Sequence, residues 1–182
     1  MRRKNEITVH GNAELEGVDL KYVRAVKSGA SLNGTRQRKT YLICFSNMKI
    51  TNNTMYFDEA KEGQYYVIAD FEGEIIEGMD NEPKEIEAGN FIPGTMFDDG
   101  NIINMKAWVG TADKWKPTMI IQNNQEDEGS TKLTHVGDGH ICGSFNVKSD
   151  GLEITGNFST PIEDDLWAKA QELKAKMKKF SK

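Results

Sequence analysis

The chain has 182 residues, of which 37% are hydrophobic and 28% are charged, and its net charge is −5. This length fits one domain and is too short for two. The composition excludes collagen-like, mucin-like and fully disordered proteins. No apolar run approaches the roughly 18 residues of a membrane span, and no apolar signal segment follows the basic start. We therefore expect a cytoplasmic protein without a membrane partner.

The charge is unevenly distributed along the chain. Residues 1–39 carry a net charge of +5, residues 40–165 a net charge of −15, and residues 166–182 a net charge of +5. Phosphate neutralisation dominates affinity for duplex nucleic acid, so the acidic body argues against such a partner. The two basic ends either attract the acidic body or form a basic patch for an anionic partner.

Strand patterns dominate most of the chain. Alternating apolar and polar residues predict a half-buried strand at 18–22, which the stretch 28–34, rich in glycine, serine and asparagine, would break. The run 40–45 is apolar on both faces and indicates a central strand, and 64–71 predicts another. Weaker strand patterns occupy 102–109, 118–122 and 131–136.

A hairpin is predicted across residues 141–158. Asp150 and Gly151 are typical of its two-residue turn, because both tolerate a positive φ. Each glycine of the two strands would then face a phenylalanine, whose ring can cover the bare backbone. The predicted register pairs Val147 with Ile154, Phe145 with Gly156, and Gly143 with Phe158.

The stretch 132–158 resembles the closing hairpin of small bacterial β-sandwich proteins of unknown function, many of them lipoproteins. The two Gly-x-Phe segments, at 143–145 and 156–158, carry the resemblance. It implies an antiparallel β-sandwich or flattened barrel and no catalytic residue. This chain lacks the lipidation motif of that group and adds a C-terminal helix. We therefore expect a mainly β fold, with an antiparallel domain over 1–160.

A C-terminal amphipathic helix is predicted over 161–182. Thr160 and Glu163 fit a capping box, with Pro161 at the first helical position. We expect the helix to pack on the sheet or to pair with the same helix of a second copy, which would make a homo-oligomer. Its apolar stripe consists of Leu166, Ala170, Leu173, Met177 and Phe180.

The segment 135–142 concentrates two histidines, a carboxylate and a thiol. A metal-assisted hydrolase using His135, Asp138 and His140 is one interpretation, because zinc needs such ligands converging on one point. The spacing matches no metal signature, and a turn at Asp138 is the simpler reading. We expect no metal and no cofactor. Cys142 and Cys44 both lie in apolar runs, which favours buried, reduced thiols over a disulfide.

Two groups of residues are candidates for binding a ligand. The cations Arg36, Arg38 and Lys39 follow a glycine-rich stretch, where guanidinium groups can contact an anion. The alternative is a basic loop that the acidic body neutralises. Trp108 and Trp115 flank a short loop and either stack on a ligand or pack in the core.

We predict a non-catalytic binding module, of bacterial or phage type. Its ligand would be a small anionic molecule, such as a nucleotide signal, or a protein partner. The hydrolase is the first alternative. The second is a structural subunit that assembles through its C-terminal helix.

Overall fold

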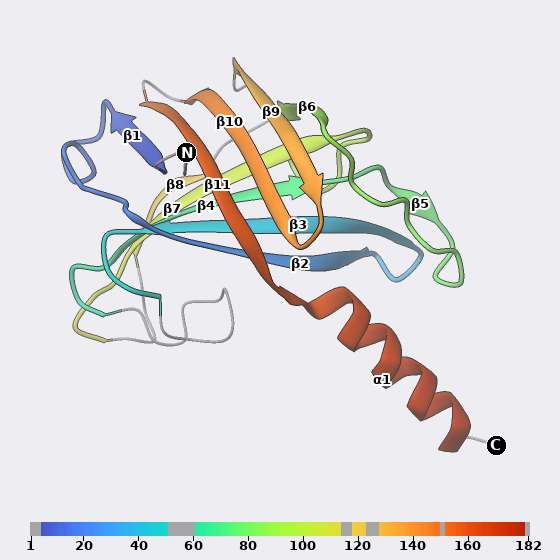
Figure 1. Ribbon diagram of the computed structural model, residues 1–182. Helices are drawn as coiled ribbons and strands as arrows, with labels where there is room; N and C mark the ends of the chain where they lie inside the picture. Colours follow the sequence, from blue (N-terminus) through green and yellow to red (C-terminus); the bar gives the residue numbers. More distant parts are fainter. Residues whose placement is uncertain (1–4, 51–60, 114–117, 123–127, 150–151, 181–182) are drawn as a thin grey trace.

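The computed structural model describes residues 5–50, 61–113, 118–122, 128–149 and 152–180. This part of the chain forms a β-barrel from which one C-terminal helix projects (Figure 1). The elements are β1 Glu6–His10, β2 Tyr22–Leu32, β3 Arg36–Ser46, β4 Tyr65–Glu72, β5 Ile76–Glu77, β6 Gly89–Pro93, β7 Ile102–Val109, β8 Thr118–Gln122, β9 Glu128–Gly137, β10 His140–Ser149, β11 Leu152–Asp165 and α1 Leu166–Phe180.

Eight strands close the barrel in the order β2-β3-β4-β7-β6-β9-β10-β11, with β11 returning to β2. The flattened barrel is therefore confirmed and the sandwich is wrong, because β6 joins β7 to β9 and β11 joins β10 to β2. These connections leave no gap that would divide the sheet in two. The pairings are antiparallel except β6 with β7 and β11 with β2, which are parallel. Strands β1, β5 and β8 pair outside the closed ring.

The barrel interior is a packed aromatic and aliphatic core. Side chains alternate along each strand, so one face of every strand points inward. Phe71 and Phe91 meet edge to face with ring centroids 5.2 Å apart, and Phe45 meets Phe145 at 5.6 Å. A smaller apolar cluster lies on the outer wall and includes Cys44. The interior is thus filled with side chains.

The predicted hairpin register is confirmed across β10 and β11. A Cβ at Gly143 would lie 2.8 Å from the Phe158 ring, so that ring does cover the glycine. Gly156 faces Phe145 as predicted, and Ile7 of β1 lies close to the place where its Cβ would be. The turn residues 150–151 lie outside the described residues.

The stretch 28–34 does not break a strand, contrary to the prediction. Strand β2 runs through it, and the chain turns at Asn33 and Gly34, whose φ values are 53° and 69°. Gly29 pairs with Lys39 within the strand, and the Trp167 ring fills the place where a Cβ would lie. The strand predicted at 18–22 begins only at Tyr22. The later strand predictions are confirmed by β3, β4, β7, β8 and β9.

The helix begins at Leu166, five residues after the predicted start. The intervening backbone continues β11 and pairs in parallel with β2, which outweighs the capping-box pattern. Asp165 caps the helix instead, since its Oδ1 accepts the N–H of Ala168 at 2.9 Å. Leu166 at the start of the apolar stripe packs on the outer-wall cluster, whereas Leu173 and Met177 are 61% and 62% exposed. None of the described helices is long and apolar enough to cross a membrane.

Candidate functional site

The three cations predicted to bind an anion lie within strand β3, not on a loop. Alternation along the strand sends Arg36 and Arg38 to the outer wall and Lys39 to the inner face, so the three do not converge. Arg36 Nε lies 3.8 Å from a carboxylate oxygen of Glu77. Arg38 and Lys39 are almost completely buried and also meet carboxylates. The acidic body thus neutralises these cations.

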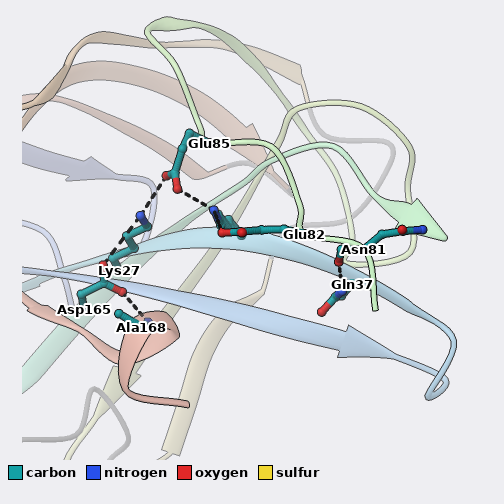
Figure 2. Close-up of polar contacts among 8 residues, drawn as sticks. Lys27, Gln37, Asn81, Glu82, Glu85, Asp165 and Ala168 are labelled. Atoms are coloured by element: carbon teal, nitrogen blue, oxygen red, sulfur yellow. Dashed lines mark hydrogen bonds and ion pairs between the residues drawn. The ribbon is translucent and has the colours of Figure 1, made fainter. Parts of the chain in front are cut away.

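Lys39 holds the acidic segment between β4 and β6 against one mouth of the barrel (Figure 2). Its Nζ donates hydrogen bonds to Glu82 at 2.9 Å and to Glu85. Burial works to lower the pKa of Lys39, but the hydrogen bonds to Glu85 and Glu82 outweigh it and raise the pKa. Lys39 therefore stays charged, and its charge is used within the protein.

The same mouth also fastens the start of α1. Lys27 Nζ lies 2.8 Å from Glu85 and 3.7 Å from Asp165, the residue that caps the helix (Figure 2). The Trp167 ring centroid lies 5.7 Å from Lys39 Nζ, within the range of a cation–π contact. These contacts link the helix, the acidic segment and strands β2 and β3. Their role at this end of the barrel is to hold these elements together.

Arg38 ties a loop to the outer wall of the barrel. Its Nη1 donates to Glu72 Oε2 at 2.8 Å, and its Nη2 donates to the backbone carbonyl of Asp98 at 2.6 Å. Asp98 lies in the loop 94–101 between β6 and β7, and its carboxylate accepts the N–H of Thr95 at 2.6 Å. Arg38 is therefore a positioning residue that holds this loop beside β3 and β4.

A pocket of about 420 Å³ lies between this loop and the outer wall. We call it the outer-wall pocket. Its volume is within the range of small-molecule sites, roughly 300–1,000 Å³. The loop contributes Phe97, which is 55% exposed, and the less exposed Met96. The lining residues are Ser28, Gly29, Ala30, Thr40, Leu42, Asp70, Glu72, Thr95, Met96, Phe97, Asn104 and Lys106.

Two acceptor oxygens in the outer-wall pocket have no hydrogen-bond donor among the described residues. They are Oδ1 of Asp70 and Oδ1 of Asn104, and both atoms are enclosed. Asp70 and Asn104 are directly opposite one another in the register of β4 and β7, where side chains share one face with Cβ atoms about 5 Å apart. An unpaired buried polar atom costs about 1–3 kcal/mol. A hydrogen-bond donor from a bound molecule would therefore be stabilising beside Asp70 and Asn104.

Burial and the neighbouring charges decide the protonation of Asp70. Burial raises the pKa of Asp70 well above its usual value, and the Glu72 carboxylate raises it further, against the opposing effect of Lys106 and Arg38. Burial also raises the pKa of Glu72, although its hydrogen bond with Arg38 opposes the rise. Glu72 is held by Arg38, so Asp70 is the one carboxyl of this pair left for a ligand.

Of the two predicted tryptophans, Trp108 is half-buried at the end of β7 and packs on the apolar cluster of the outer wall. Its position fits the packing alternative. Trp115 lies outside the described residues.

The histidine-rich segment does not assemble a metal centre within the described part of the chain, which holds no group of three metal-ligating side chains. Asp138 occupies the β9–β10 turn with a φ of 51°. His135 Nε2 contacts the Gly137 carbonyl at 3.2 Å, whereas His140 Nε2 lies 2.9 Å from Ser159 Oγ. The two imidazoles thus have separate partners. Cys142 and the buried Cys44 are both free thiols.

Sequence reasoning missed Asp70 and Asn104. A signal was present, because each is a polar residue inside a predicted apolar strand, at 64–71 and 102–109. Polar side chains are costly in such positions unless they are paired. Which face each one occupies, and that the two strands are neighbours, followed only from the register.

Comparison of the chain with protein-family models, with curated proteins and with solved structures found no match. Function is therefore inferred from the site itself.

Proposed function

We propose that this protein is a non-catalytic binding module that holds a small molecule in the outer-wall pocket. The observation that carries the proposal is the pair of enclosed, donor-less oxygens on Asp70 and Asn104. A folded protein leaves such groups unpaired at a cost, and ligand sites are where that cost is offset by binding. The half-exposed Phe97 at the rim adds an apolar surface for the same ligand.

The charge of the pocket limits the net charge of the ligand that it can bind. Arg38 and Glu72 cancel one another, which leaves Lys106 and Asp70. The pocket is then neutral, or carries one positive charge when Asp70 is protonated. A small anion such as a nucleotide would place its anionic group at Lys106, and Arg36, Arg38 and Lys39 would not take part.

Native mass spectrometry of the full chain, purified without added ligand, tests the proposal. We expect an additional mass of a few hundred daltons per subunit that disappears on denaturation. The variant Ser28→Phe fills the pocket and should remove this mass. The matched control Ser130→Phe places the same side chain on an exposed position of β9 and should keep it. A bare wild-type protein that also shows no thermal shift with a small-molecule library would overturn the proposal.

Self-association through α1 is a second candidate function. The exposure of Leu173 and Met177 favours it, because the barrel does not cover this part of the apolar stripe. The helix carries exposed lysines at 169, 174, 176 and 179. Two such helices would repel one another unless their lysines meet acidic residues of the second copy. This candidate is independent of the outer-wall pocket and is compatible with it.

A further inference from the structure

The arrangement of acceptors in the outer-wall pocket specifies a chemical class of ligand, on the assumption that the pocket is a binding site as proposed above. We infer that it recognises a planar nitrogen heterocycle through two adjacent N–H donors, the pattern found on the edge of guanine. The ring would lie against Phe97, and an anionic substituent would point toward Lys106.

The two acceptors carry the first step of this inference. Asn104 lines the pocket and is only 6% exposed, and its enclosed Oδ1 has no donor among the described residues. Asp70 supplies a second enclosed acceptor directly across the β4–β7 pair. A ligand that satisfies both oxygens needs two donors only a few ångströms apart. Ring and exocyclic N–H groups of an amino-substituted heterocycle have this spacing, whereas phosphate and carboxylate groups offer no donor.

The walls of the pocket carry the second step. Phe97 on the loop presents a half-exposed ring, and Leu42 lies opposite Asp70 on β3. Flat rings gain affinity by stacking on such side chains, by about 1–3 kcal/mol per base in alanine substitutions. A planar donor-bearing ring uses both features.

The protonation of Asp70 gives the inference a specific signature. Asp70 faces Glu72 on its own strand, Arg38 on β3 and Lys106 on β7, and the loop carboxylate of Asp98 acts on Glu72. Burial and Glu72 hold a proton on Asp70 to a higher pH than usual. The ionised carboxylate is the stronger acceptor for an N–H donor, so binding of such a ligand favours release of that proton. Affinity should therefore fall as the pH drops, and a ligand that needs an acidic donor would show the opposite trend.

Isothermal titration calorimetry of the full chain with three nucleotides provides the test. Guanosine monophosphate offers a ring N–H and an exocyclic amine side by side, inosine monophosphate lacks the amine, and adenosine monophosphate has one donor beside an acceptor. We expect guanosine monophosphate to bind at least about tenfold more tightly than inosine monophosphate, because a buried acceptor otherwise stays unpaired. Adenosine monophosphate should bind more weakly still. The binding enthalpy should depend on the ionisation enthalpy of the buffer.

Variants separate recognition from folding. Asp70→Asn replaces a carboxylate acceptor by an amide, which should weaken the binding of guanosine monophosphate. It should strengthen the binding of xanthosine monophosphate, because the 2-oxo group of that nucleotide accepts the new N–H. Phe97→Ala removes an exposed ring and should lower affinity about tenfold. Asp138→Asn makes the same change as Asp70→Asn in the β9–β10 turn, where asparagine also tolerates the positive φ, and should change nothing.

The outcomes distinguish the two proposals. Equal affinities for the guanosine and adenosine nucleotides, or an Asp70→Asn variant with unchanged preference, would overturn the heterocycle inference. If no nucleotide binds while a retained mass is still lost in Ser28→Phe, the pocket binds another class of molecule, and only the heterocycle inference fails. If the retained mass is absent and no compound shifts the unfolding temperature, the proposed function fails as well.

Discussion

Arg38 and Glu72 form an ion pair that is buried in the outer wall, with Nη1 and Oε2 2.8 Å apart and both side chains no more than 3% exposed. The pair also fixes the loop 94–101, because the same guanidinium donates to the carbonyl of Asp98. A residue predicted to bind a ligand at the surface thus holds one side of the outer-wall pocket in place. Its loss should affect stability first and ligand binding second.

Arg38→Ala should lower the free energy of unfolding by about 3–5 kcal/mol, because it leaves the buried Glu72 without its counter-charge. Chemical denaturation measures this change. Arg36→Ala is the matched control, since Arg36 is more exposed and lies 3.8 Å from its carboxylate. We expect that variant to stay within about 1 kcal/mol of wild type. Similar losses in the two variants would show that the Arg38–Glu72 pair contributes little.

Asp70→Asn should stabilise the ligand-free protein at neutral pH. Burial and the neighbouring Glu72 raise the pKa of Asp70 in the folded state above its usual value of 3.8. The folded state then holds a proton that the unfolded state has released, so wild-type stability falls as the pH rises from about 4 through the raised pKa. The variant does not lose stability in this way, because its amide does not ionise.

Thermal unfolding from pH 3 to pH 8 checks this sign. The variant and wild type should converge below the unfolded-state pKa and separate as the pH increases. A variant that is less stable than wild type at pH 7 would mean that the ionised Asp70 is satisfied in the free protein. Higher stability together with weaker binding is the pattern expected when a site is kept for a ligand.

Gly143→Ala should destabilise the barrel by about 1–3 kcal/mol, as overpacking of a core does. A Cβ at this position would lie 2.7 Å from the Lys132 carbonyl and 2.8 Å from the Phe158 ring, and backbone cannot easily yield. Gly89→Ala is the control, because nothing lies within 4 Å of its Cβ position. Denaturation midpoints of the two variants measure the difference, and equal midpoints would contradict the close contact at Gly143.

The double variant Leu173→Glu/Met177→Glu should leave the stability of the barrel within about 0.5 kcal/mol, because both residues are exposed. If α1 drives self-association, the same variant should be monomeric where wild type is oligomeric. Sedimentation velocity at several concentrations measures this. The double variant Ala168→Glu/Ala175→Glu provides a charge-matched control at two other exposed helix positions. A wild-type monomer at all concentrations would remove assembly as a function of the helix.

Local pattern determined a large part of the fold. The register of β10 and β11 follows from a turn signal and a period-two pattern, and both are properties of neighbouring residues. The central strands β3 and β4 follow from continuous apolar runs. A C-terminal helix follows from apolar residues at spacings of three and four. Its start does not, because pairing with β2 satisfies the backbone of residues 162–165 as strand.

The proposed ligand site depends on contacts between distant parts of the chain. Arg38 reads in the sequence as part of a basic cluster, and only the fold brings Glu72 and Asp98 to it. Asp70 and Asn104 lie 34 positions apart in the sequence and become neighbours because β4 pairs with β7. The sequence alone determines the charge and the hydropathy of each side chain. Whether a charge is neutralised, and whether an oxygen lacks a donor, depends on which strands adjoin, and that was decided by the closure of the barrel.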